Sequence, residues 1–196
     1  MISTHIPALQ VVVPLMAAPI CLLLRVRGWA WGFALIVSWI ALACAWLLLQ
    51  KVLADGTIVY ALGGWAAPWG IEYRVDEVNA FVLLIVATIG AVVIPYARES
   101  VEKEYGTQRN YLFYTAYLLC LAGLLGVTIT GDAFNLFVFL EISSLSSYVL
   151  IALGPDRRAL TAAYQYLVLG TIGATFIVIG VGLLYAATGT LNMADL

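Results

Sequence analysis

The sequence predicts an all-α integral membrane protein with about six transmembrane helices and a short hairpin at the membrane surface. Of its 196 residues, 64% are hydrophobic and only 10% are charged. A soluble domain carries about 25% charged residues, so this composition excludes a water-soluble fold. Six apolar runs reach the length of about 20 residues that a helix needs to cross the bilayer, and one alternating segment lies between the second and third runs.

The six runs are expected to be the helices of one membrane domain that covers residues 1–196. The first run contains Pro14 and Pro19, which membrane helices tolerate where neighbouring groups satisfy the freed carbonyl groups. It is not expected to be a cleavable signal, because no basic residue precedes it and its hydrophobic stretch is too long. The predicted helices are roughly 6–24, 29–50, 77–97, 109–129, 133–153 and 159–187.

Two connections between these helices are longer than turns. Residues 98–108, RESVEKEYGTQ, are strongly charged and predict a solvated loop. Residues 57–76 contain several glycines and a proline, followed by Ile71, Tyr73 and Val75 in alternation with polar residues. This period of two is typical of a half-buried strand. The segment therefore predicts a short hairpin on the membrane surface.

The positions of lysine and arginine predict the orientation. If successive helices alternate in direction, seven of the nine basic residues lie at one end of the helices, and only Lys51 and Arg74 lie at the other. Cytoplasmic ends of membrane helices carry the excess of basic residues. The N-terminus, the hairpin and the C-terminus are therefore expected outside. The seven residues are Arg25, Arg27, Arg98, Lys103, Arg109, Arg157 and Arg158.

Several classes of site find no support in the sequence. There is no Gly-rich phosphate loop, no cluster of histidine and cysteine, and no basic patch for nucleic acid. The three cysteines, Cys21, Cys44 and Cys120, lie within apolar runs and lack the spacing of metal ligands. No cofactor, metal or nucleic-acid partner is therefore expected, and the lipid bilayer is the expected surrounding of the helices.

Glu141 is the first candidate for a functional residue. It lies eight residues after the start of the run 133–153, near mid-membrane at about 1.5 Å of rise per residue. A charge there costs at least about 2.5–3.5 kcal/mol, and none of the six runs places a lysine or arginine at that depth. One interpretation is a proton or cation relay, in which the carboxyl group changes protonation as a partner moves. The other is a fixed pair that only joins helices.

Four further residues are candidates for a polar path near Glu141. Ser144 and Tyr148 follow at i+3 and i+7, on the same side of the helix, although hydroxyl groups also serve close packing of membrane helices. Asp132 fits the N-cap of the fifth helix, with an entrance for ions as the alternative. Gln165 is a polar residue in the sixth run. That run also carries small residues expected to pack closely against another helix, namely Gly170, Gly173, Ala174 and Gly180.

Three stretches carry a resemblance to a known family. They are ALGGWAAPWGIEYRVDEVNAFVLL, TGDAFNLFVFLEISSLSSYVLIALG and RRALTAAYQYLVLGTIGATFIVIGVGLLYAATGTLNMADL. Together they closely resemble the D subunits of the multisubunit Mrp-type sodium/proton antiporters. The wider superfamily includes the antiporter-like, proton-pumping subunits of respiratory NADH:quinone oxidoreductase and of membrane-bound hydrogenases.

The resemblance implies a function and a partner for Glu141. Members carry an essential glutamate in the fifth transmembrane helix, which corresponds to Glu141, and it pairs with a lysine of the seventh helix. Members are much longer chains built from inverted repeats, so the present sequence corresponds to the N-terminal part, and a further polypeptide is expected to supply the remaining helices. The family also has an external N-terminus.

The implied activity is exchange of monovalent cations such as Na⁺ for protons, without enzyme chemistry, in a hetero-oligomeric complex of a bacterial or archaeal cell membrane. One alternative is a proton-pumping subunit of an NADH:quinone oxidoreductase or a membrane-bound hydrogenase. A second alternative is a structural scaffold subunit without transport activity.

Overall fold

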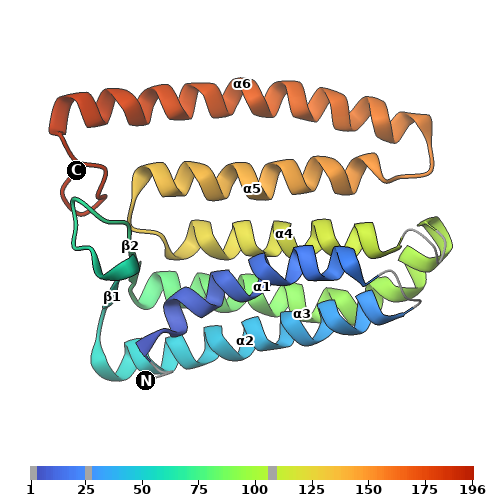
Figure 1. Ribbon diagram of the computed structural model, residues 1–196, viewed down its shortest axis with the longest axis horizontal. Coiled ribbons are helices and arrows are strands. Elements are labelled where there is room, and N and C mark those ends of the chain that lie inside the picture. Colours follow the sequence, from blue (N-terminus) through green and yellow to red (C-terminus); the bar gives the residue numbers. More distant parts are fainter. Residues whose placement is uncertain (1–3, 25–27, 106–109) are drawn as a thin grey trace.

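The computed structural model describes residues 4–24, 28–105 and 110–196, and within them six long helices run alongside one another (Figure 1). All six are long and apolar enough to cross a membrane, which confirms the predicted fold class. The start of α1, the hairpin and the C-terminus lie at one end of the helices. The helices are α1 (Ile6–Leu23), α2 (Trp29–Asp55), α3 (Glu77–Tyr105), α4 (Asn110–Ile129), α5 (Ala133–Ala152) and α6 (Arg157–Thr188).

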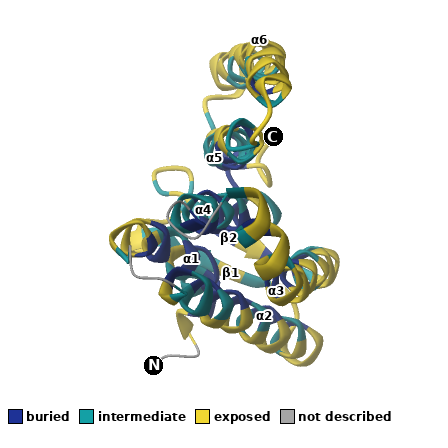
Figure 2. Cartoon of the chain, turned by 90° about the vertical axis from the view of Figure 1, so that its right-hand side faces the viewer, coloured by how far each residue is buried: buried dark blue, intermediate teal, exposed yellow. Residues whose placement is uncertain are grey.

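The first four helices form a bundle, and α5 and α6 extend from it as a pair. Helix α4 packs against α1 and α3 on one side and against α5 on the other, while α6 packs against α5. Figure 2 shows the buried residues gathered between α1, α2, α3 and α4, and α6 almost wholly exposed. Small side chains let membrane helices approach closely, and the bundle buries many of them, including Ala34, Ala41, Ala45, Ala80, Ala87 and Ala91.

Helix α3 corrects one prediction. Residues 98–105, predicted as part of a solvated loop, continue α3 to Tyr105, and residues 106–109 lie outside the described part. The reason is that charged residues spaced by four also stabilise an exposed helix. Arg98 pairs with Glu102 at 3.5 Å, and its guanidinium group lies 4.5 Å from the ring centroid of Trp31.

The segment between α2 and α3 is the predicted hairpin. Strands β1 (Ile58–Ala61) and β2 (Glu72–Val75) pair antiparallel, with Tyr60 opposite Tyr73. Tyr73 and Val75 are buried and Arg74 between them is exposed, so the predicted period of two holds within β2. A single 3₁₀ turn, η2 (Leu62–Gly64), follows β1.

The hairpin is extended by two further backbone segments. Tyr73 of β2 forms an antiparallel bridge with Thr130, in the connection from α4 to α5, and Asp132 forms another with Asn192, after α6. The Gly131 amide donates to the Glu72 carbonyl at 3.0 Å. These bonds tie the first residues of α5 both to the hairpin and to the chain that follows α6.

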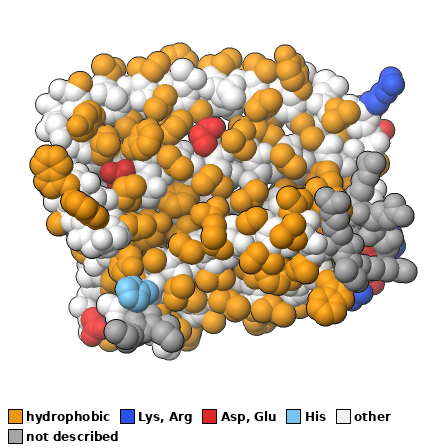
Figure 3. Space-filling model, in the orientation of Figure 1, with side chains coloured by type: hydrophobic (Ala, Val, Ile, Leu, Met, Phe, Trp, Pro, Cys, Tyr) orange, Lys and Arg blue, Asp and Glu red, His pale blue; other side chains and the backbone are white. Residues whose placement is uncertain are grey.

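The described basic residues lie at the two ends of the helices, in the distribution expected if successive helices alternate in direction. Arg98 and Lys103 near the end of α3 lie at the same end as Arg157 and Arg158 of α6, whereas Lys51 and Arg74 lie at the hairpin end. Figure 3 shows an apolar face between the two ends, with the visible basic side chains at the right. Arg25, Arg27 and Arg109 fall outside the described residues.

Candidate functional site

The site is built on α5, whose first turn is fixed by a side-chain cap. The Asp132 carboxylate accepts a hydrogen bond from the Asn135 backbone amide at 2.7 Å, which satisfies an amide that the helix itself cannot. The Asn135 side chain donates to the Thr130 hydroxyl at 3.0 Å. The predicted N-cap role of Asp132 is therefore confirmed.

Asp132 and its neighbours form a polar cluster at the hairpin end of α5. Thr130, Asp132 and Asn192 are all buried there, beside Tyr73. Burial raises the pKa of the Tyr73 hydroxyl, and the Asn135 side chain opposes that shift, so Tyr73 stays neutral near pH 7. No periodic pattern in the sequence joins these residues, because they come from three separate segments: the hairpin, the connection from α4 to α5, and the chain after α6.

One side of α5 packs tightly against α4. A Cβ atom at Gly123 would lie 2.6 Å from the Ser143 backbone nitrogen, and one at Gly126 would overlap the Phe139 ring. Glycine at these two positions thus permits the close approach of the helices. The hydroxyl groups on α5 near this interface donate within their own helix, Ser143 to Leu140, Ser146 to Ile142 and Ser147 to Ser143, at 2.6–2.9 Å.

The opposite side of α5 faces α6 through Tyr148. Its ring meets the Tyr166 ring edge-on, with centroids 4.9 Å apart, and its hydroxyl lies against Gly170, where a Cβ atom would collide with it. Residues three, four and seven apart share one side of a helix. Glu141 and Ser144 precede Tyr148 by seven and four residues, so they lie on the side of α5 that faces α6.

Glu141 is half-buried on this side and makes no hydrogen bond or ion pair among the described residues. Ser144 likewise has no hydrogen-bond partner in that part of the chain. A carboxyl group at this depth needs a proton, a cation or water, because an unpaired charge in the bilayer interior costs at least about 2.5–3.5 kcal/mol. The described residues therefore supply no side chain that pairs with the Glu141 carboxyl group.

The structure does not bring every predicted residue to Glu141. Asp132 is nine residues away on the same helix, roughly 14 Å along its axis at 1.5 Å per residue. Gln165 is exposed and lies one position before Tyr166, about 100° around α6 from the side that meets α5.

The predicted small-residue surface of α6 is only partly engaged. The Tyr148 hydroxyl packs against Gly170. A Cβ atom at Gly173 or Gly180, in contrast, would have no neighbour within 4 Å. Ala163 is the one buried residue of α6 within the described chain. Most of α6 thus presents apolar side chains to its surroundings rather than to the helices described.

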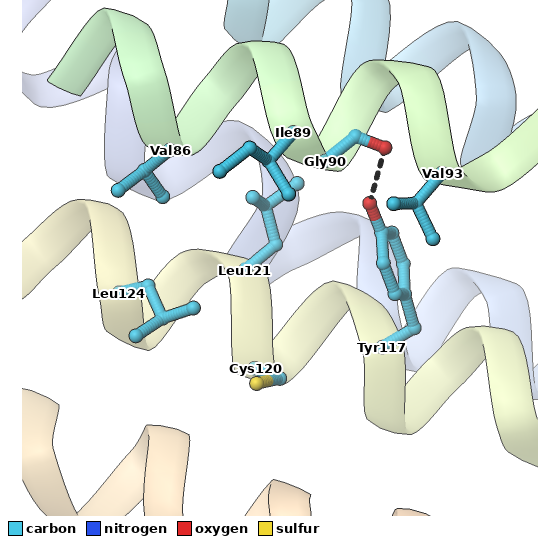
Figure 4. Close-up of a pocket in the computed structure, with 8 residues that line it drawn as sticks. All are labelled: Val86, Ile89, Gly90, Val93, Tyr117, Cys120, Leu121 and Leu124. Atoms are coloured by element: carbon cyan, nitrogen blue, oxygen red, sulfur yellow. Dashed lines mark hydrogen bonds between the residues drawn. The ribbon is translucent and has the colours of Figure 1, made fainter.

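A groove elsewhere in the bundle has a different character. It lies between α3 and α4 with a volume of about 230 Å³ (Figure 4). The Tyr117 hydroxyl, its main polar group, donates to the Gly90 carbonyl at 2.7 Å. The groove therefore offers no polar route. Its lining comprises Val86, Ile89, Gly90, Val93, Tyr117, Cys120, Leu121 and Leu124.

Comparisons with known proteins place this arrangement in a family. Residues 130–196 match the family model described as "NADH:quinone oxidoreductase/Mrp antiporter, TM". The chain is 43% identical over 202 residues to the N subunit of the NADH-quinone oxidoreductase of Desulforudis audaxviator, covering 99% of this chain and 39% of that protein. It is 39% identical over 164 residues to the D subunit of the Na⁺/H⁺ antiporter of Bacillus subtilis, covering 84% and 33%.

Two solved complexes contain chains of the same fold. The membrane-bound sulfane sulfur reductase, an archaeal respiratory complex, has a chain that superposes with a TM-score of 0.88 at 34% identity, covering 97% of this chain and 39% of that one. The Mrp complex of Dietzia gives 0.85 at 26% identity, covering 100% and 36%. The chain spans about two fifths or less of the length of these relatives. Residues 130–196 carry the membrane domain of the NADH:quinone oxidoreductase/Mrp antiporter family, and almost the whole chain is homologous to part of a subunit from that family.

Proposed function

We propose that this chain is part of a multisubunit antiporter that exchanges a monovalent cation, Na⁺ in the first instance, for protons, and that Glu141 takes up and releases the proton. Support comes from the relatives that are D subunits of Na⁺/H⁺ antiporters and, above all, from the position of Glu141. It is the acidic residue within the apolar span of α5, and it has no partner among the described residues.

The side of α5 that carries Glu141 suits a change of protonation. The α4 side is packed without room for water at Gly123 and Gly126, so exchange of a proton has to occur on the α6 side. Ser144 and Tyr148 share that side and supply hydroxyl groups that can hold water. Asp132 caps the helix at the hairpin end and Gln165 lies off this side, so neither takes part in the exchange at Glu141 itself.

Further helices complete the site in this proposal. Relatives of this chain are subunits of multisubunit complexes, and they are more than twice its length. We place the additional helices against the uncovered sides of α6. A lysine or arginine carried by them would approach Glu141 and withdraw, favouring its charged and its neutral form in turn.

A proton-pumping subunit of a redox-driven complex is the second candidate. It is favoured by the 43% identity to a membrane subunit of an NADH-quinone oxidoreductase over 99% of this chain and by the fit to the sulfane sulfur reductase. In either case the chain conducts ions rather than catalysing a reaction. Purification of the native complex distinguishes them, because iron–sulfur or quinone-binding subunits accompany the chain only in a redox-driven pump.

Replacement of Glu141 tests the proposal. Glu141→Gln keeps the shape of the side chain and removes its titrating proton, so it should abolish ion exchange while the complex still assembles. The assay is a pH-gradient measurement in inverted membrane vesicles. Glu99→Gln, at an exposed position of α3, is the matched control and should leave exchange intact. Near-normal exchange by Glu141→Gln would contradict the relay and favour a purely structural carboxyl group.

We also propose that the hairpin end faces outward. The described basic residues favour the opposite end by four, Arg98, Lys103, Arg157 and Arg158, to two. Single cysteines at Asp55 or Asp195, in a chain without its three native cysteines, should react with an impermeant thiol reagent added to intact cells. A cysteine at Lys103 should not. Labelling of the cysteine at Lys103 alone would show that the protein has the opposite orientation.

A further inference from the structure

The apolar groove between α3 and α4 is open on the outside of the bundle, where membrane helices contact lipid. Ile89, Val93 and Leu124 line it and are 59%, 46% and 43% exposed. The hydrogen bond from Tyr117 to Gly90 joins the two helices there (Figure 4). A helix with its side chains is about 10–12 Å across, so a groove of about 230 Å³ is too small to seat one. A flexible acyl chain, in contrast, can follow it.

A polar hollow continues the groove along α3. Residues three or four apart share one side of a helix, and Tyr96 follows Val93 of the groove by three residues. Ser100 and Lys103 then follow at the same spacing. The groove and the hollow therefore lie along one side of α3. The hollow has a volume of about 390 Å³ and is lined by Pro95, Tyr96, Glu99, Ser100 and Lys103.

Lys103 has its charge available in this hollow. Glu99 precedes it by four residues, a spacing at which opposite charges often pair, yet Lys103 forms no ion pair within the described chain. A lysine ammonium group binds phosphate as a point charge, and the hydroxyl groups of Tyr96 and Ser100 can donate to phosphate oxygens. Tyr96 is 84% exposed, and tyrosine is enriched at the headgroup level of membranes. The hollow is therefore suited to the phosphate of a lipid.

The distance between the groove and the hollow matches the length of a phospholipid. Ile89 and Lys103 are 14 residues apart, which is roughly 21 Å at 1.5 Å of rise per residue. A bilayer with its headgroups is about 40–45 Å thick, so one leaflet, and one phospholipid in it, spans roughly 20–22 Å. A single lipid molecule can therefore reach both.

We propose that this side of α3 binds one phospholipid of the membrane, with its phosphate at Lys103 and an acyl chain in the α3–α4 groove. Glu99 also lines the hollow and repels a headgroup with net negative charge, so the ligand is a zwitterionic phospholipid, phosphatidylethanolamine in the first instance. The site is separate from Glu141, because α4 lies between α3 and α5 (Figure 1).

Photocrosslinking of the chain in nanodiscs tests the groove. The nanodiscs consist of phosphatidylglycerol with a small fraction of phosphatidylethanolamine that carries a diazirine near the end of one acyl chain. Ile89 should be labelled several-fold more than Ile172 of α6, whose exposed fraction is similar at 51%. The depths also match, because Ile172 lies 14 residues from the basic residue Arg158, as Ile89 does from Lys103. Equal labelling of the two isoleucines would indicate contact with bulk lipid only and would overturn the proposal.

Lys103→Met tests the contact with the phosphate. Labelling at Ile89 should fall to the level at Ile172, whereas Lys103→Arg, which keeps the positive charge, should retain most of it. Lys103 is exposed, so both variants should fold. Undiminished labelling in Lys103→Met would overturn the role of Lys103. The same diazirine on phosphatidylglycerol should label Ile89 several-fold less, and equal labelling by the two lipids would overturn the zwitterionic headgroup.

Discussion

The α1–α4 bundle and the α5–α6 pair differ in how much of their apolar surface they bury. In the bundle, Leu48, Leu83, Leu118 and Leu125 have at most 1% of their surface exposed. In the apolar span of α6 no residue is buried by the rest of the described chain. Both regions are equally apolar in sequence, so composition does not explain the difference. The bundle forms its own interior, whereas α6 leaves its apolar surface uncovered by the rest of the described chain.

The two regions also treat buried polar groups differently. Gln10 of α1 is fully buried within the bundle. Glu141 lies half-buried on the side of α5 away from the close contact with α4. The bundle thus encloses its polar side chain completely, while the α5–α6 pair leaves its carboxyl group partly exposed.

The largest expected effect contrasts one leucine in each region. Leu125→Ala leaves a cavity in the packed bundle and should lower the free energy of unfolding by about 2–5 kcal/mol. Leu183→Ala in α6, where the side chain is 67% exposed, should change that of the isolated chain by less than about 0.5 kcal/mol. Denaturant titration of the chain in detergent measures both.

The same pair of variants sharpens the contrast in the native complex. If further helices cover α6, Leu183→Ala should become destabilising there, while Leu125→Ala should cost the same as before. A large loss for Leu183→Ala in the isolated chain would show that α6 already has a packed interior of its own.

A smaller effect is expected where α5 closely approaches α6 at Gly170. A methyl group at Gly170 would lie 2.8 Å from Tyr148 Cζ and closer to its hydroxyl, so Gly170→Ala should cost about 1–3 kcal/mol by overpacking. Tyr148→Ala should remove that cost when the two changes are combined. Gly173→Ala, where the space is open, is the control and should be neutral or slightly stabilising, because alanine favours a helix. Equal effects at the two glycines would contradict the contact.

The sequence predicts the parts of this structure that depend on local pattern. The lengths of the apolar runs predicted the six helices, and the period of two predicted strand β2. The small residues of α6 predicted a close helix contact, which the structure shows at Gly170. The side chain that fills this space, Tyr148, could not be predicted, because the facing helix contributes it at an unrelated position.

Two misses have other physical causes. Residues 98–105 were predicted as a loop because charge is common to solvated loops and to exposed helices, and only the pairing of Arg98 with Glu102 separates the two. The bridges of Tyr73 to Thr130 and of Asp132 to Asn192 involve single residues, which leave no periodic signal.

The smallest expected effect concerns the charged end of α3. Arg98 pairs with Glu102 across one helical turn and stacks on Trp31 of α2, which joins the extension of α3 to the bundle. Because exposed ion pairs and cation–π contacts each contribute about 0.5–1 kcal/mol, Arg98→Ala should lower the free energy of unfolding by roughly 1 kcal/mol. Arg158→Ala, at an exposed position of α6 at the same end, is the matched control and should have almost no effect. In a double-mutant cycle, Glu102→Ala should cost less in the Arg98→Ala background than in the wild type, because the partner is already gone. Additive effects would mean that the two side chains do not interact, and their pair would then contribute nothing to the helical state of residues 98–105.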